Sequence, residues 1–205
     1  MLQDCLGIPH VSTGDMLRER VRQGAEAGTA VAATMQSGAL VRDEVVNRMV
    51  EDRLTRPDAL PGFILDGYPR TVAQAGHLRG WFVERQILPV VIHLAVDYNV
   101  IIARLTGRRQ CPRCGTLYNL LSQPPKVDEL CDLDGERLIV REDDRESVIR
   151  ERLDAYERQT RPVLDYFQSV GRKVWEVKAD NAPPQEIFQK ICRVLEQHDC
   201  TEDRR

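Results

Sequence analysis

Residues 63–70 read FILDGYPR, a short apolar run that ends in Asp-Gly and is followed three residues later by an arginine. In open α/β sheets, ligands bind just beyond the carboxyl ends of the strands. As the end of such a strand, Asp66 lies at the mouth of a site, where its carboxylate can hold Mg²⁺ through water. Arg70 can place two nitrogens on one phosphate. The segment also reads as a surface turn closed by Gly and Pro, so taken alone it leaves both interpretations open.

Three more β-like runs flank this segment, at residues 8–12, 90–96 and 173–178. The run at 90–96, VVIHLAV, is apolar almost throughout, which is typical of a strand covered on both faces. Helical patterns separate the runs. Strands that alternate with helices predict an α/β fold with a parallel sheet and helices on both faces.

Apolar residues at helical spacing predict where several helices begin. One begins at Asp43, an acidic cap ahead of an apolar stripe. A second follows Asp144 and contains Pro162, so we expect a kink there. The last begins around residues 183–184, and residues 1–6 read as the end of a further helix.

Composition narrows the class of protein. The chain has 205 residues, 42% hydrophobic and 30% charged, and a formal net charge of −3. These values fit one core with a small satellite domain and indicate neither a nucleic-acid nor a membrane surface. No apolar run approaches the roughly 20 residues of a membrane helix. Of six cysteines, three sit at metal-ligand spacing and three are scattered, which predicts a reducing, cytoplasmic compartment.

Residues 109–143 interrupt the alternation and predict a small inserted subdomain between core segments 1–108 and 144–205. Cys111-Pro-Arg-Cys114-Gly is followed, after sixteen residues, by Cys131-Asp-Leu-Asp134-Gly. Two such corners predict a tetrahedral structural zinc site with the Asp134 carboxylate as fourth ligand. Two alternatives are buried cysteines beside a turn aspartate, and a free-standing ribbon that binds nucleic acid. The acidic composition and the α/β surroundings argue against the ribbon.

Arginines flank both ends of this insert. Arg108 leads into it, Arg141 leads out, and Arg152 follows in the next helix. Arg18 stands one turn into a helix that follows a strand end, where the simpler interpretation is an ordinary N-cap. A charged helix face normally faces solvent. Arginines at both hinges of an insert are nevertheless placed as a mobile lid requires.

Four segments, in this order, resemble adenylate kinases of the long-lid type: GIPHVSTGDMLR (7–18), GFILDGYPRTVAQA (62–75), RLTGRRQCPRCGTLYN (104–119) and REDDRESVIRERL (141–153). The resemblance runs from about residue 6 to residue 195. It implies the three-layer α/β fold of P-loop nucleoside monophosphate kinases, with a parallel sheet, AMP-binding helices at about 13–42 and a zinc-binding lid.

The resemblance also implies the reaction, in which Mg²⁺·ATP and AMP give two ADP by in-line phosphoryl transfer. Positioning and charge stabilisation dominate such a transfer, so no general base or covalent nucleophile is needed. Lid closure excludes water. The implied catalytic residues are Arg70, Arg108, Arg141, Arg152 and the Mg²⁺-supporting Asp66. The implied partners are ATP, AMP and ADP, and a monomer is expected through the resemblance alone.

Two nucleotide pockets are implied in the same way. Gln74 can read the adenine edge because its amide offers a donor and an acceptor side by side. The implied AMP pocket consists of Thr13, Arg18, Ala39, Leu40, Val41, Gly67, Tyr68, Pro69, Arg70, Gln74, Arg141 and Arg152. The implied ATP pocket consists of Arg104, Arg108, Leu117, Tyr118 and Ala182.

One part of the family pattern does not occur in these 205 residues. The family opens with an apolar strand and a G-x-x-x-x-G-K-[ST] loop ahead of the segment that matches residues 7–12, and this sequence has neither. We therefore expect unpaired edges in the middle of the parallel sheet and no backbone cradle or lysine for the ATP phosphates. We expect the true start to lie upstream of Met1; the alternative is a real, inactive truncation.

Two other functions remain open at this stage. One is a kinase for a different nucleoside monophosphate, although Thr13 with Gln74 favours adenine. The other is a non-catalytic protein that binds AMP and zinc.

Overall fold

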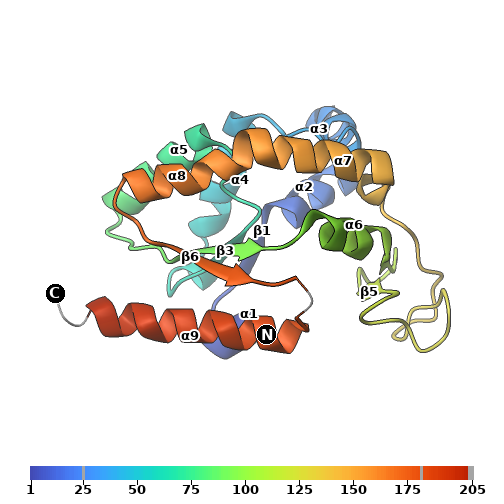
Figure 1. Cartoon of the computed structure of the whole chain (residues 1–205). Helices are drawn as coiled ribbons and strands as arrows, with labels where there is room; N and C mark the ends of the chain where they lie inside the picture. Colours follow the sequence, from blue (N-terminus) through green and yellow to red (C-terminus); the bar gives the residue numbers. More distant parts are fainter. Residues whose placement is uncertain (25, 181, 203–205) are drawn as a thin grey trace.

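Strands and helices alternate along residues 1–24, 26–180 and 182–202, which are the part of the chain that this computed structural model describes (Figure 1). The strands are β1 His10–Ser12, β2 Ile64–Asp66, β3 Val91–Ala95, β4 Arg108–Gln110, β5 Leu117–Asn119 and β6 Val174–Lys178. The helices are α1 Leu2–Leu6, α2 Thr13–Arg22, α3 Glu26–Gln36, α4 Asp43–Leu54, α5 Val72–Glu84, α6 Tyr98–Thr106, α7 Glu146–Ala155, α8 Arg161–Ser169 and α9 Pro184–Glu202. Short helical turns are η1 Pro57–Ala59, η2 Glu142–Asp144 and η3 Tyr156–Thr160.

The four central strands form two parallel pairs, β1 with β2 and β3 with β6. Helices α4, α5, α7 and α8 lie on one side of these strands, and α1 and α9 lie on the other (Figure 1). The α/β prediction is therefore confirmed. β1, β3 and β6 are one or two residues shorter than their apolar runs, whereas β2 begins one residue into its run and extends to Asp66.

The two pairs do not join into one sheet. Within the described residues, β2 pairs only with β1, and β3 pairs only with β6. A cavity of about 1630 Å³, which we call the hollow, is lined by residues of both β2 and β3. The predicted unpaired edges in the middle of the sheet are thus present in the structure.

The main core packs β1 and β2 against α2, α4 and α5. Val11 and Val50 are each only 1% exposed within it. Phe63 stacks on Phe82 with 6.2 Å between ring centroids, and Trp81 meets both rings edge-on. Aromatic pairs in these geometries stabilise a core beyond the area they bury. They fix the strand whose carboxyl end carries the predicted site loop.

The kink predicted at Pro162 takes the form of a wide helical turn. Between α7 and α8, residues 156–160 form a π-turn that ends just before the proline. Proline lacks an N–H and its ring clashes with the carbonyl four residues earlier, so the α-helical ladder cannot continue through it. The Thr160 hydroxyl in this turn donates to the carbonyl of Arg70 at 3.0 Å. The interruption therefore contacts the loop after β2.

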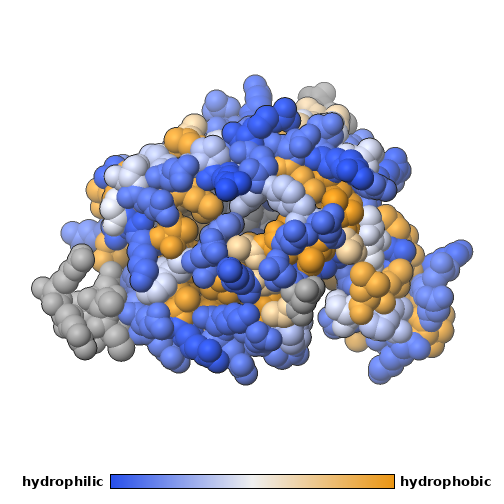
Figure 2. Space-filling model, viewed as in Figure 1, coloured by the Kyte–Doolittle hydropathy of each residue, from blue (hydrophilic) through white to orange (hydrophobic). Residues whose placement is uncertain are grey.

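The insert, residues 109–143, projects from the body as a separate lobe (Figures 1 and 2). Its regular structure is the antiparallel pair of β4 with β5, and much of the rest is turns. Its buried core contains only Cys111, Tyr118, Cys131 and Leu138. Among the described helices, none combines the length and apolar character needed to cross a membrane.

Candidate active site and metal centre

The loop after β2 is held by hydrogen bonds that require a glycine. Gly67 has φ 72°, and a Cβ there would lie 2.9 Å from Arg70 Nη2 and 3.0 Å from Thr13 Oγ1. The Gly67 carbonyl accepts from the Thr13 hydroxyl and from Arg70 Nε, each at 2.9 Å. The shared carbonyl holds the Arg70 guanidinium next to Thr13, at the start of α2. A guanidinium fixed in this way is ready to bind an anion.

Five arginines from separate elements approach one another; we call Arg18, Arg70, Arg108, Arg141 and Arg152 the arginine cluster. Burial, followed by the positive charges of Arg152 and Arg18, lowers the pKa of Arg70. Burial, followed by the positive charges of Arg18 and Arg108, likewise lowers the pKa of Arg141. Guanidinium groups this close repel one another, so the cluster favours an anion between them.

Two aspartates that were not among the predicted site residues partly neutralise the cluster. Asp143 accepts from Arg18 Nη1 at 3.4 Å. Asp144, 2% exposed, lies 3.4 Å from Arg108 Nη1 and 3.6 Å from Arg152 Nη1. Burial raises the pKa of Asp144 despite these cations. The sequence signal for both aspartates was their position two and three residues after the hinge residue Arg141.

A small cavity of about 70 Å³ lies where α2, α4, α5 and the loop after β2 meet. Its volume corresponds to a few waters of roughly 30 Å³ each. Most of the predicted AMP residues line it: Thr13, Arg18, Ala39, Leu40, Val41, Gly67, Arg70, Gln74 and Arg152.

Three of the predicted AMP residues lie elsewhere. Tyr68 and Pro69 line the hollow instead, and the Tyr68 hydroxyl donates to Asn47 at 2.7 Å. Burial raises the pKa of Tyr68, so this hydroxyl stays a donor. Arg141 donates from Nε to Gln110 of the insert at 2.7 Å and is 9% exposed.

Two sets of hydrogen bonds connect Arg104, one of the predicted ATP residues, with segments next to other members of that set. Arg104 donates to the carbonyls of Ala179 at 2.9 Å and Asp180 at 2.6 Å, on the loop that leads to Ala182. The carbonyl of Arg104 accepts from Asn119 Nδ2 at 2.8 Å, so the β5 end that carries Leu117 and Tyr118 is joined to α6. The Leu117 side chain is exposed, whereas Tyr118 is buried.

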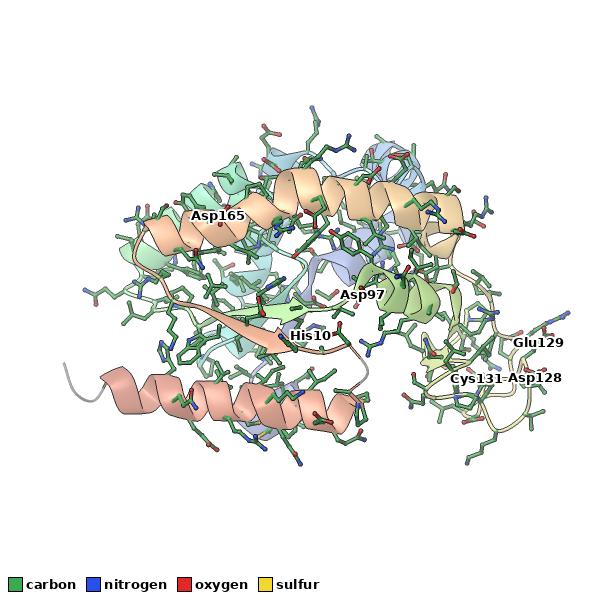
Figure 3. The ribbon with its side chains drawn as sticks, viewed as in Figure 1. His10, Asp97, Asp128, Glu129, Cys131 and Asp165 are labelled. Atoms are coloured by element: carbon green, nitrogen blue, oxygen red, sulfur yellow. The ribbon has the colours of Figure 1, made fainter. Side chains whose placement is uncertain are left out.

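Asp66 lies at the carboxyl end of β2, as the sequence predicts. Its carboxylate is 62% exposed and lies 3.2 Å from His10 Nε2. His10 was not predicted as a neighbour, because only the parallel pairing of β1 with β2 brings it there. His10 and Asp97 both line the hollow, in the body of the molecule and away from the lobe that carries Cys131 (Figure 3).

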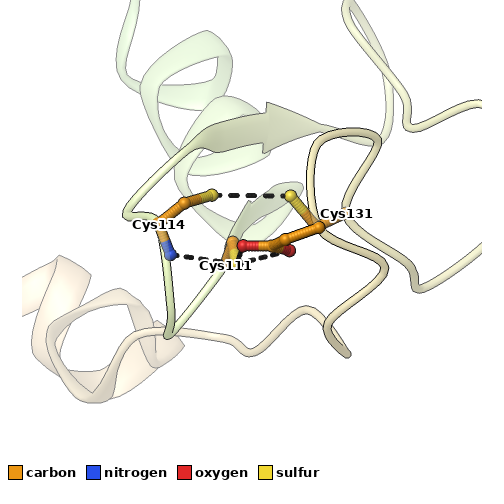
Figure 4. Close-up of side chains that lie close together, drawn as sticks. Cys111, Cys114 and Cys131 are labelled. Carbon is orange, nitrogen blue, oxygen red and sulfur yellow. Dashed lines mark hydrogen bonds between the residues drawn. The ribbon is translucent and has the colours of Figure 1, made fainter.

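The four predicted metal ligands come together in the insert. One ligand atom from each of Cys111, Cys114, Cys131 and Asp134 lies within 4.8 Å of every other. The Cys114 and Cys131 sulfurs are 3.5 Å apart, and Cys111 Sγ is 3.4 Å from the Asp134 carboxylate (Figure 4). Two sulfurs bound tetrahedrally at 2.3 Å are about 3.8 Å apart, so this donor set fits zinc with a slight expansion.

The ionisation of these ligands suits a metal as well. The Cys131 hydrogen bond and then the Glu136 backbone N–H lower the pKa of Asp134 to about 2. Burial raises the pKa of Cys111 to about 11. The carboxylate is therefore already ionised, whereas the buried thiol must lose its proton when a metal binds.

Known proteins match this chain over most of its length. The family model described as adenylate kinase matches residues 1–172. An adenylate kinase from Thermotoga maritima is 47% identical over 172 residues, which are 83% of this chain and 78% of the relative. One from Pseudothermotoga lettingae is 43% identical over 189 residues, 92% of this chain and 86% of the relative. One from Anaeromyxobacter sp. is 45% identical over 175 residues, which are 83% of this chain and 80% of the relative.

The residues matched by the family model include the loop after β2, the arginine cluster and the insert. The names of the relatives support phosphoryl transfer between adenine nucleotides as the chemistry of the family. The chain belongs to the adenylate kinase family of phosphotransferases.

Proposed function

We propose that this chain serves the reversible transfer of a phosphoryl group from Mg²⁺·ATP to AMP, which gives two ADP. The 205 residues alone would carry out this transfer only slowly, because no G-x-x-x-x-G-K-[ST] loop occurs among them to hold the ATP phosphates. The observation that carries the proposal is the arginine cluster, in which cations from α2, the loop after β2, β4, the end of the insert and α7 approach one another. Charge stabilisation by such groups is the main requirement of phosphoryl transfer.

In this proposal Arg18 and Arg70 hold the AMP phosphate, beside the small cavity that both residues line. Arg108, Arg141 and Arg152 stabilise the charge on the transferring phosphoryl group. Asp143 orients the guanidinium of Arg18, and Asp144 orients those of Arg108 and Arg152. The phosphates then replace these carboxylates as the acceptors.

The proposed metals have different roles. Mg²⁺, bound with ATP, neutralises charge that develops on the phosphate oxygens. Asp66 is the residue placed to hold the waters of that ion, because its exposed carboxylate ends β2. Zinc would be structural, because three thiolates and one carboxylate complete a four-coordinate site. We also propose that the insert acts as a lid over the ATP.

Binding of AMP tests the proposal directly. Isothermal titration calorimetry of the 205-residue protein is expected to show AMP bound at least about 10-fold more tightly than CMP or UMP, because one well-made hydrogen bond to a charged or fixed partner contributes that much. Equal affinity for the three nucleotides would identify a less selective monophosphate kinase. Binding of none of them contradicts the proposal.

Loss of zinc is expected to unfold the insert and leave the body folded. The insert has a buried core of only four residues, two of which are ligands, so the metal supplies much of its folding free energy. We expect Cys131→Ser to abolish stoichiometric zinc and to speed proteolysis within residues 109–143 at least about 10-fold.

The matched control is Cys5→Ser, since Cys5 is an exposed cysteine on α1, outside the ligand cluster. It should keep both the zinc content and the resistance of the insert to protease. A Cys131→Ser protein that retains one zinc per chain would contradict this role for the cluster.

We also propose a cytoplasmic monomer. The cysteines at 5, 111, 114, 131 and 192 are free thiols, which suits a reducing compartment. Sedimentation equilibrium tests the oligomeric state, with one chain mass of 23.4 kDa expected.

A further inference from the structure

The side-chain amide of Gln74 is held from both sides. Its Oε1 accepts from the backbone N–H of Arg70 at 2.7 Å, and its Nε2 donates to Oδ1 of Asp43 at 2.7 Å. The residue is 2% exposed and lines the small cavity. The oxygen of the amide therefore faces a hydrogen-bond donor, and its nitrogen faces an acceptor.

Asp43 is itself fixed by a second contact. Its other oxygen, Oδ2, accepts from the Thr71 hydroxyl at 2.8 Å, and that hydroxyl caps α5 by accepting from the Gln74 N–H at 3.1 Å. The carboxylate thus joins the first residue of α4 to the first turn of α5. Neither oxygen can turn away from Gln74 without breaking this network.

This arrangement prevents the amide from rotating by 180°. A rotated Gln74 would turn its Oε1 toward the Asp43 carboxylate and its Nε2 toward the Arg70 N–H. Both contacts would then be repulsive, because a carboxylate only accepts and a backbone N–H only donates. Leaving buried polar groups unpaired in this way is costly.

A fixed amide presents a fixed order of donor and acceptor. Oε1 keeps one lone pair and Nε2 keeps one hydrogen for a ligand. Adenine carries an N6–H donor beside the N1 acceptor, which matches this order. Hypoxanthine and guanine carry an O6 acceptor beside an N1–H donor, which is the reverse. A phosphate held by Arg18 and Arg70 determines which way round the base enters, so the reverse order cannot be met by turning the ligand over.

We propose that Asp43 is a specificity-determining residue, which positions the Gln74 amide so that AMP binds and 6-oxopurine monophosphates are rejected. The inference rests on the proposed function, because it takes the small cavity as the place where the adenine base binds. Asp43 itself does not touch the nucleotide in this arrangement; it acts through Gln74.

The test compares the affinities for AMP and inosine 5′-monophosphate in the 205-residue protein and its Asp43→Asn variant. Inosine monophosphate has the 6-oxo edge without the 2-amino group of guanine, so size does not confound the comparison. In the variant, the asparagine NH₂ can donate to a rotated Gln74, so that only the Arg70 N–H still opposes the rotation. We expect the dissociation constant of inosine monophosphate divided by that of AMP to fall about 10-fold, the lower end of what one hydrogen bond to a charged group contributes, because one of the two contacts that reject the rotated amide is removed.

Glu44→Gln is the matched control. It removes one acidic charge from the same first turn of α4, where Glu44 is exposed. In this control, the ratio of the dissociation constants for inosine monophosphate and AMP should stay within about twofold of the ratio in the unsubstituted protein, as for most surface substitutions. Asp43→Ser provides a second variant, since a serine hydroxyl can either donate or accept a hydrogen bond. The melting temperature of each variant verifies that it is folded.

The outcomes separate this inference from the proposed function. If Asp43→Asn and Asp43→Ser weaken both nucleotides equally, or leave the ratio unchanged, Asp43 has only a structural role and the inference is overturned, while AMP binding stands. If the unsubstituted protein binds neither nucleotide, the proposed function fails and this inference fails with it.

Discussion

A polypeptide of these 205 residues alone is expected to turn over ATP and AMP at least about 10³-fold more slowly than a version preceded by a β-strand and a G-x-x-x-x-G-K-[ST] loop, since one preorganised charge-stabilising donor alone contributes 10²–10³. Such a loop holds ATP phosphates with its backbone N–H groups and its lysine. The hollow between β2 and β3 is where an added parallel strand would find two unpaired edges. The production of ADP from ATP and AMP, measured by a coupled assay, tests this.

A control separates the repair of the sheet from the repair of the site. Extending the chain with the same strand and a loop whose lysine is replaced by alanine should raise the melting temperature but recover little of the rate. Each buried backbone group left without a partner costs about 1–3 kcal/mol, against a typical net stability of about 5–15 kcal/mol. Near-normal turnover by the 205 residues alone would show that the arginine cluster suffices.

Replacement of both Arg18 and Arg70 by alanine is expected to weaken AMP binding by about 10²–10⁴-fold, because each guanidinium–phosphate contact contributes roughly 1.5–3 kcal/mol. The two residues line one small cavity, and each lies among other cations that favour an anion. Calorimetry with AMP and with adenosine measures the effect. Adenosine has no phosphate, so its affinity should change little.

The control for net charge is Arg20→Ala with Arg79→Ala, two exposed arginines on α2 and α5. This pair removes the same charge, from α2 and from the helix that follows the loop carrying Arg70, and should leave the AMP affinity within about threefold, as expected for long-range effects screened by salt. If the Arg18/Arg70 double variant binds AMP as tightly as the unsubstituted protein, these residues do not hold the phosphate.

Local patterns in the sequence were sufficient to predict the four central strands and several of the helices, but not β4 and β5 of the insert. The apolar run at 90–96 forms β3, Asp43 begins α4, and Pro162 follows the interruption between α7 and α8. The four metal ligands could be identified for the same reason, since their spacing along the chain is itself the pattern. These features depend on neighbours a few residues apart.

Contacts between distant segments could not be predicted in this way. Asp43 meets Gln74 across 31 positions, and Arg18 meets Asp143 across 125. No periodicity reports such distances, and each aspartate alone reads as a helix cap or a solvent-facing charge. The contacts of Asp144 with Arg108 and Arg152 were also inaccessible, because they depend on how the end of the insert packs against β4 and α7.

The π-turn between α7 and α8 makes this segment respond differently to the gain and the loss of a residue. Successive residues of a helix point about 100° apart. A π-turn holds about one residue more than an α-turn, so removing one residue from positions 156–160 lets the turn close to α-helical spacing with α8 kept in its orientation. Adding one residue instead would swing the apolar stripe of α8, with Val163 and Phe167, away from β6 and α5.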